Sequence, residues 1–94
     1  MGTVKLSGIE YAAKFSFRTY MLYEEITDGK SVQDIKGIKD MIKLFYCSLK
    51  AYNDSFNYSF EQFVDLIEEE PSVFNDLTSL FTTSLGEVKK KISL

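Results

Sequence analysis

The side chains that could carry catalysis are few in this chain of 94 residues, which contains no histidine and one cysteine. Histidine is the commonest general base and the commonest zinc ligand, so its absence removes both roles. Cys47 cannot build a structural zinc site alone, and no histidine is present to activate it as a nucleophile. Because Cys47 falls inside a predicted helix, far from the N-terminal end that would lower its pKa, we interpret it as a packing or surface residue.

Acidic residues share one face of a predicted helix over 59–69; they are Glu61, Asp65, Glu68 and Glu69. They could bind a metal ion or act as paired carboxylates only if they converged in a pocket. A solvated helix face is the more usual reason for such a run of charges, and we favour it here. The five glycines are too scattered for a phosphate-binding loop. We therefore predict no catalytic residue, no metal site and no cofactor, and a protein that is not an enzyme.

Length and composition predict a single domain over residues 1–94. The net charge of −3 argues against nucleic acid as the main partner, because phosphate contacts need a basic surface. One cysteine cannot form an intramolecular disulfide, which fits a reducing compartment. The N-terminus lacks a signal-peptide pattern, and no stretch reaches the ~18 apolar residues of a membrane span. We expect a cytoplasmic protein that is not secreted and does not bind a membrane.

The elements that would position these side chains begin with a central helix, predicted over about 32–52. Its apolar residues recur at helical spacing; they are Ile38, Met41, Ile42, Phe45, Leu49 and Tyr52. The remaining polar ribbon is narrow and consists of Lys39, Asp40, Lys43 and Lys50, with Cys47 inside it. A helix with so broad an apolar arc is normally covered on more than one side. Gly37 leaves two possibilities open, a continuous helix or a short turn followed by a longer helix.

A β-hairpin is predicted over 3–16, with Ser7-Gly8 as its two-residue turn. The resulting register pairs apolar residues on one face and opposite charges on the other: Leu6 with Ile9, Lys5 with Glu10, and Val4 with Tyr11. The odd-numbered positions after the turn should continue the buried face: Ile9, Tyr11, Ala13, Phe15 and Phe17. A lone hairpin is barely stable in water, so we expect helices to cover this face.

Three further helices are predicted, over about 17–27, 59–69 and 71–85. The first should turn Phe17, Tyr20, Met21 or Tyr23, and Ile26 inward, and Asp28-Gly29 should end it. After the polar linker 53–57, Ser59 and Gln62 form a capping box that opens the next helix, whose apolar stripe is Phe60, Phe63, Val64 and Ile67. Pro71 favours the first turn of the last helix, and Gly86 should weaken or end it, leaving the tail 87–94 to fray. The predicted fold class is α+β, mostly α, with an N-terminal hairpin packed on about four short helices.

The last helix carries an apolar side that could bind a partner protein, because exposed apolar helix faces mark such surfaces. The candidate partner-binding residues are Phe74, Leu77, Leu80, Phe81 and Leu85. The alternative is that Phe74, Leu77 and Phe81 simply close the core, as amphipathic stripes usually do.

The order of these features resembles the tail assembly chaperones of long-tailed bacteriophages and prophages. The resemblance spans Thr3 to Pro71 and rests on four stretches: the strand pair VKLSGIEYAAKFSF, the turn EEITDGKS, the central helix MIKLFYCSLKAY, and the helix SFEQFVDLIEEEP. It implies a non-catalytic protein of the bacterial host cytoplasm that coats the tape measure protein and helps recruit tail tube protein. A homo-oligomer is also compatible with it.

Two other functions remain open on the sequence. One is a small structural or adaptor protein of a prophage or other mobile element, acting as a permanent oligomer. The other is a DNA-binding regulator, which is less favoured because no predicted helix clusters arginine and lysine for phosphate contacts.

Overall fold

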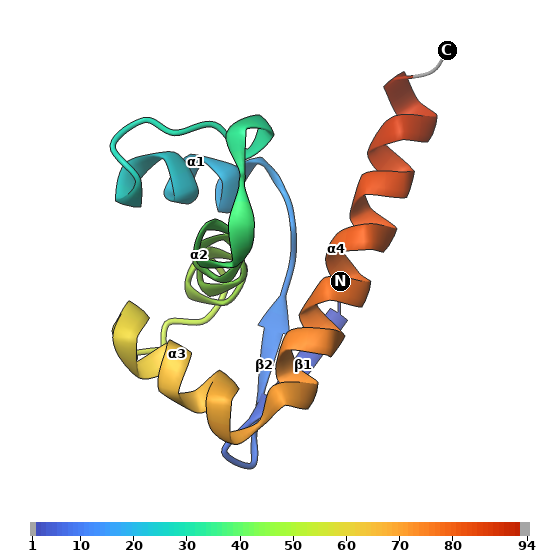
Figure 1. Cartoon of the computed structure of the whole chain (residues 1–94). Coiled ribbons are helices and arrows are strands. Elements are labelled where there is room, and N and C mark those ends of the chain that lie inside the picture. The colour runs from blue at the N-terminus through green and yellow to red at the C-terminus, as the bar shows by residue number, and fades with distance from the viewer. Residues whose placement is uncertain (1, 93–94) are drawn as a thin grey trace.

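The structure, a computed structural model, describes the backbone of residues 2–92 and the side chains of residues 2–84. Its elements are β1 (Gly2–Leu6), β2 (Ile9–Ala13), α1 (Phe17–Ile26), the 3₁₀ turn η1 (Val32–Asp34), α2 (Gly37–Lys50), α3 (Phe60–Glu69) and α4 (Pro71–Ile92). The α+β, mostly α architecture is therefore confirmed. Helix α2 lies in the middle, α1 and α3 flank it, and the hairpin lies between α2 and α4 (Figure 1).

The hairpin has the predicted register, with Leu6 opposite Ile9 and Gly2 opposite Ala13. Ser7 and Gly8 both adopt positive φ, as the tight two-residue turn requires. The predicted burial of the odd-numbered positions is confirmed for Tyr11, Ala13 and Phe15. It is wrong for Ile9 and Phe17, whose side chains are 53% and 83% exposed. Ile9 follows the turn directly, at the tip of the hairpin, where its side chain remains partly in solvent. Phe17 follows the end of the strand, where the two-residue alternation has already stopped.

Helix α1 packs through Thr19 and Tyr23, both fully buried. The Thr19 hydroxyl donates to the Lys14 carbonyl at 2.6 Å, which satisfies the buried polar group. Tyr20 is half-buried, and of the two alternatives Met21 and Tyr23 it is Tyr23 that turns inward. The predicted inward positions of Phe17 and Ile26 are wrong, because both side chains are exposed. Apolar side chains occur on two faces of this helix, and only its packing against α2 decides which face is inside.

Helix α2 is the central helix, and the break at Gly37 is present. Gly37 has φ +79°, a conformation that favours glycine, and it separates η1 from α2. Six consecutive residues from Leu44 to Leu49 are buried, so several elements cover the second half of the helix. The predicted polar ribbon is wrong at Asp40 and Cys47, which are buried. Ile38 is 63% exposed because the first turn of the helix lies at the edge of the core.

Helices α3 and α4 begin at the predicted caps. Both bonds of the capping box form, from the Gln62 N–H to the Ser59 hydroxyl and from the Ser59 N–H to the Gln62 amide oxygen. Pro71 is the first residue of α4, as predicted. The helix continues to Ile92 and so passes the predicted end at Gly86, since one glycine costs a helix only about 1 kcal/mol.

Aromatic side chains fill the core in two groups, and the rings within each group are in contact. One joins Tyr11, Tyr46 and Phe63 around Phe56, with ring centroids 5.4 to 5.9 Å apart. The other joins Phe15, Phe45, Phe74 and Phe81. Phe56 is 2% exposed although it belongs to the predicted polar linker, whose polar composition hid its role. Phe56 thus anchors an otherwise largely exposed linker in the core.

Candidate functional site

The predicted partner-binding side of α4 lies mostly against the core. Leu77 is fully buried, while Phe74, Leu80 and Phe81 are half-buried and pack on the buried residues. The Phe81 ring lies 5.1 Å from that of Phe15, and the Phe74 ring 5.3 Å from that of Phe45. The Leu85 side chain lies outside the described residues. Of the four candidate side chains that the structure describes, only the outer edges of Phe74, Leu80 and Phe81 are therefore open to a partner.

A more exposed apolar surface lies on α1. Phe17 is 83% exposed and Met21 66% exposed, one helical turn apart, and Ile26 is 39% exposed at the end of the helix. Beside them, a shallow groove of about 540 Å³ runs between α1 and the C-terminal end of α2; it is lined by Arg18, Met21, Leu22, Glu25, Lys50 and Ala51. We call Phe17, Met21 and this groove the α1 surface. Periodicity missed it, although apolar residues on two faces of one helix were a visible signal.

Two cationic residues, Arg18 and Lys50, line the groove, and the cationic group of each lies near an aromatic ring. The Lys14 Nζ and the Arg18 Cζ lie 5.9 and 6.0 Å from the ring centroid of Tyr52. The Lys50 Nζ lies 5.6 Å from the ring of Tyr46. A cation over an aromatic face gains electrostatic attraction, which restrains its position. The α1 surface therefore combines an apolar floor with a mixed rim in which Arg18 and Lys50 outnumber Glu25.

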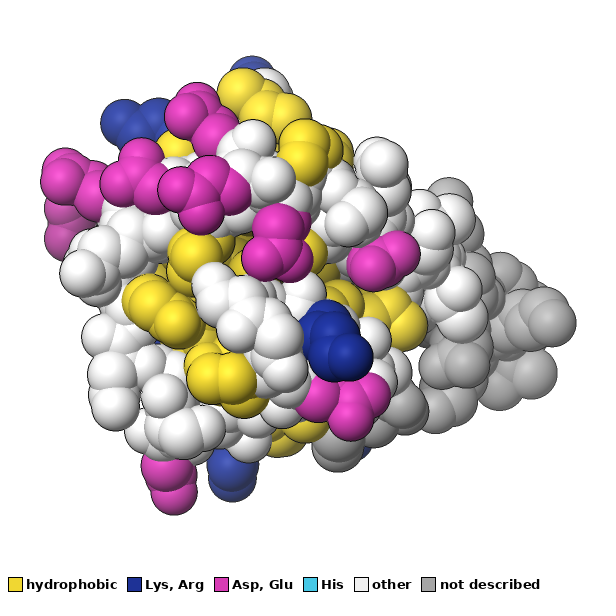
Figure 2. Space-filling model, turned by 90° about the horizontal axis from the view of Figure 1, so that it is seen from below, with side chains coloured by type: hydrophobic (Ala, Val, Ile, Leu, Met, Phe, Trp, Pro, Cys, Tyr) yellow, Lys and Arg dark blue, Asp and Glu magenta, His cyan; other side chains and the backbone are white. Residues whose placement is uncertain are grey.

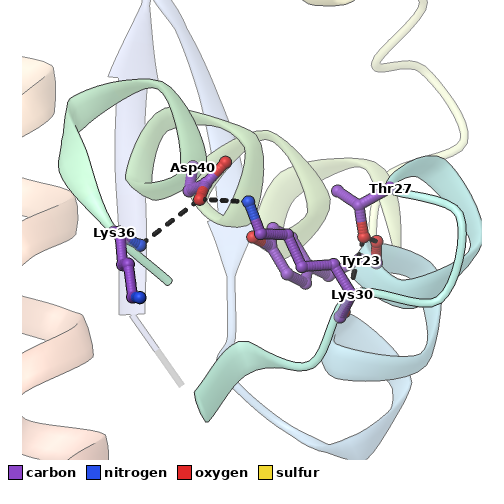
Figure 3. A network of polar contacts seen from close by, with 5 residues as sticks. All are labelled: Tyr23, Thr27, Lys30, Lys36 and Asp40. Carbon is purple, nitrogen blue, oxygen red and sulfur yellow. Dashed lines mark hydrogen bonds and ion pairs between the residues drawn. The ribbon is translucent and has the colours of Figure 1, made fainter. Parts of the chain in front are cut away.

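A polar cluster joins the loop after α1 to the start of α2 (Figure 3). The Asp40 carboxylate accepts from the Lys30 ammonium at 2.7 Å and from the Lys36 N–H at 3.3 Å. These two bonds lower the pKa of Asp40, with the Lys30 bond the larger cause, and the same bond raises the pKa of Lys30. Both donors come from the segment between α1 and α2, so these contacts fix that segment on the first turn of α2.

The Tyr23 hydroxyl lies beside this cluster and is the one buried side-chain polar atom, among those described, that lacks a hydrogen-bond partner. Burial raises the pKa of Tyr23, and the nearby Asp40 carboxylate raises it further. A phenol with a raised pKa stays protonated at neutral pH and can act only as a neutral donor or acceptor.

Cys47 is fully buried in the middle of α2. Burial raises its pKa to about 12, so the reactive thiolate is scarce at neutral pH. Of the two interpretations of this residue, packing is therefore the one that fits its position.

The acids of α3 face solvent. Glu61, Asp65, Glu68 and Glu69 are all exposed, and acidic side chains form a row beside apolar ones on the underside of the molecule (Figure 2). Within residues 2–84, no three potential metal ligands lie close enough together to hold an ion. The acids are thus arranged as a solvated helix face.

None of the helices in the described part of the chain is long and apolar enough to cross a membrane. No protein-family model matches the sequence, and neither a curated protein nor a solved structure matches the chain.

Proposed function

We propose that the protein is a non-catalytic assembly chaperone of the phage tail type, which binds the tape measure protein through the α1 surface. The observation that carries the proposal is the exposure of Phe17 and Met21, at 83% and 66%, in a domain that has a complete core without them. Large apolar side chains left together on a surface mark a site that a partner covers. The resemblance of residues 3–71 to tail assembly chaperones supplies the identity of the client and the bacterial cytoplasm as the location.

The shape of the α1 surface favours a helical client segment. An amphipathic helix can lay its apolar face in a groove and present residues at i, i+3 and i+7 to it. The floor of the groove offers Met21, Leu22 and Ala51, and the rim offers Arg18 and Lys50 to acidic side chains of the client. Such contacts would shield a long, aggregation-prone protein while tail tube protein is recruited around it.

Co-expression with the tape measure protein of the same prophage tests the proposal, with the soluble fraction of that protein as the readout. The variant Phe17→Asp/Met21→Lys keeps the net charge and changes only exposed side chains, so it should stay folded and lose solubilisation. The matched control Ile9→Lys/Ile38→Asp removes two exposed isoleucines elsewhere, with the same charge balance, and should retain it.

Three results would count against this proposal. A tape measure protein that is equally insoluble with and without the wild-type chain would exclude the chaperone function. Solubilisation that survives in the α1 variant and is lost in a folded Phe74→Asp/Phe81→Asp variant would move the site to α4. A stable oligomer that persists in purified particles would favour the structural or adaptor function instead.

A further inference from the structure

The two edges of the hairpin differ in whether their outward-pointing backbone groups form hydrogen bonds. On β2, the Asn53 side chain takes the place of a neighbouring strand: the Ala12 N–H donates to its Oδ1 at 3.0 Å, and its Nδ2 donates to the Ala12 carbonyl at 2.7 Å. Ala12 therefore points its backbone groups away from β1. Thr3 lies directly opposite Ala12 in the antiparallel register, so its own N–H and carbonyl point away from β2, toward the outer edge of β1.

The outer edge of β1 is open. Lys5 has the same orientation as Thr3, because it lies two residues further along the strand and opposite Glu10. Both residues are exposed, and no described residue forms a hydrogen bond with their N–H or carbonyl groups. An unpaired edge of this kind is a template for another strand.

A hollow accompanies this edge. It measures about 380 Å³ and is lined by Thr3 on β1 and by Asp76, Ser79, Leu80 and Thr83 on α4. Helix α4 approaches β1 so closely at Gly2 that a Cβ there would lie 2.3 Å from the Leu80 Cδ2. The hollow is therefore bounded by a strand edge on one side and by a helix on the other. Asp76 is exposed in it and forms no ion pair with any described basic side chain.

We propose that the outer edge of β1 binds an extended segment of a partner protein by strand addition, with a lysine or arginine of that segment against Asp76. Thr3 and Lys5 supply the backbone hydrogen bonds, which recognise any extended peptide. Leu80 supplies an apolar contact, and the Asp76 carboxylate supplies the preference for a basic side chain. This site is separate from the α1 surface, since it uses β1 and α4. Its test is therefore independent of the proposed binding of a client helix.

A second copy of the chain is a poorer occupant than a single strand. Pairing β1 with β1 of a second copy about a two-fold axis would place the second α4 on the same face of the enlarged sheet. Both helices would then compete for the space beside the edge, which α4 already bounds through Asp76, Ser79 and Thr83. A lone extended peptide brings no such helix.

Nuclear magnetic resonance titration of the ¹⁵N-labelled full chain tests this inference, with the peptide acetyl-Val-Lys-Val-Lys-Val-Lys-amide as the probe. Binding should shift the amide signals of Thr3 and Lys5. Two further peptides carry N-methyl groups on all valines or on all lysines, and each leaves one strand edge able to bond. We expect one of them to bind like the parent and the other not to bind.

Variants of the protein locate the site. Lys5→Pro removes an outward N–H without touching the ladder and should weaken binding about tenfold, as the loss of one or two hydrogen bonds predicts. Lys5→Ala removes the same charged side chain but keeps the outward N–H, so it is the matched control and should bind like the wild type. Asp76→Lys should also weaken binding about tenfold at low salt, while Asp65→Lys on α3 should not.

Three outcomes would overturn the inference. In the first, both methylated peptides bind as well as the parent, or the shifted signals belong to α1. In the second, neither Lys5→Pro nor Asp76→Lys, both confirmed as folded by their spectra, weakens binding. In the third, sedimentation shows a dimer of the free chain that Lys5→Pro dissociates, which would make a second copy the occupant of the edge.

Discussion

Asp40 shows how one charged side chain can hold a loop in place. It lies one turn into α2 and is 8% exposed, yet it keeps its charge because Lys30 and the Lys36 N–H both donate to it. Lys30 leads into η1, so the ion pair ties the segment after α1 to the central helix. Its side chain remains 42% exposed, which screens the pair and limits its contribution.

Acid should therefore weaken the fold partly through Asp40. The pKa of this carboxyl is lowered in the folded state, so the unfolded state binds more protons once the pH falls below about 4. The stability from this group is present above that pH and is lost as the pH falls through the folded-state pKa. In thermal melts between about pH 2 and pH 6, the melting temperature of Asp40→Asn should fall less with decreasing pH than that of the wild type. The control is Asp54→Asn, because Asp54 is exposed and forms no ion pair with any basic side chain that the structure describes. The same dependence of the melting temperature on pH in all three proteins would contradict the prediction.

Cys47 should be chemically silent in the folded protein. Its pKa of about 12 and its complete burial leave neither thiolate nor access for a reagent. An aromatic disulfide reagent at about pH 8 should react with it only after guanidinium unfolds the chain. Rapid reaction of the native protein would show that α2 opens locally or that the thiol is accessible.

At the scale of elements, Asn53 joins three parts of the fold. Its amide bonds both backbone groups of Ala12 on β2 and also donates to the Leu49 carbonyl at 2.7 Å, near the end of α2. One side chain thus closes the β2 edge and fixes the hairpin on the central helix. Edges left open invite pairing with other chains, so this contact also shields the edge of β2 from such pairing.

Asn53→Ala should lower the free energy of unfolding by about 2 to 3 kcal/mol, because three hydrogen bonds are lost and each contributes about 1 kcal/mol net. The variant should also aggregate faster, since the edge of β2 is then unpaired. Urea denaturation and light scattering measure the two effects. Asn57→Ala, in the same loop but exposed, is the control, and equal stability of the two variants would refute the role of Asn53.

At the scale of the whole molecule, the core is continuous from the hairpin to α4. Val4, Leu6, Phe45, Phe63 and Leu77 all belong to one buried cluster, although the first and last of them are far apart in sequence. A domain of this size with one core is expected to unfold in a single step. Stability changes in α4 should therefore be felt in the hairpin.

Leu77→Ala should lower the free energy of unfolding by about 2 to 5 kcal/mol, the usual range for a fully buried leucine. The hydrogen-exchange protection of β1 and β2 should fall by the factor in the unfolding equilibrium that corresponds to this loss. Phe17→Ala, a larger truncation at an 83% exposed position, should change the stability by no more than about 0.5 kcal/mol. Urea denaturation and amide exchange provide the measurements. Hairpin protection that is unchanged in a destabilised Leu77→Ala variant would show that α4 unfolds separately.

Local signals in the sequence determined much of this protein. The Ser7-Gly8 turn and the alternation around it predicted the register of the hairpin, because turn geometry and side-chain facing are short-range properties. Ser59, Gln62 and Pro71 predicted where α3 and α4 begin, because caps act within one helical turn. The apolar arc of residues 38–52 predicted the central helix, because helical periodicity is likewise a local property of the chain.

Only the tertiary structure decided which of several apolar faces is covered. Phe17, Met21 and Ile9 are exposed, whereas Phe56 and Asp40 are buried, and each outcome depends on neighbours from other parts of the chain. The same holds for the candidate sites. The α1 surface exists because α1 packs on α2 through Thr19 and Tyr23, which leaves the other face of α1 outside. The two edges of the hairpin differ because Asn53 bonds the edge of β2, whereas no described residue bonds the outer edge of β1. Burial is a property of the assembled molecule, so a pattern within one segment cannot specify it.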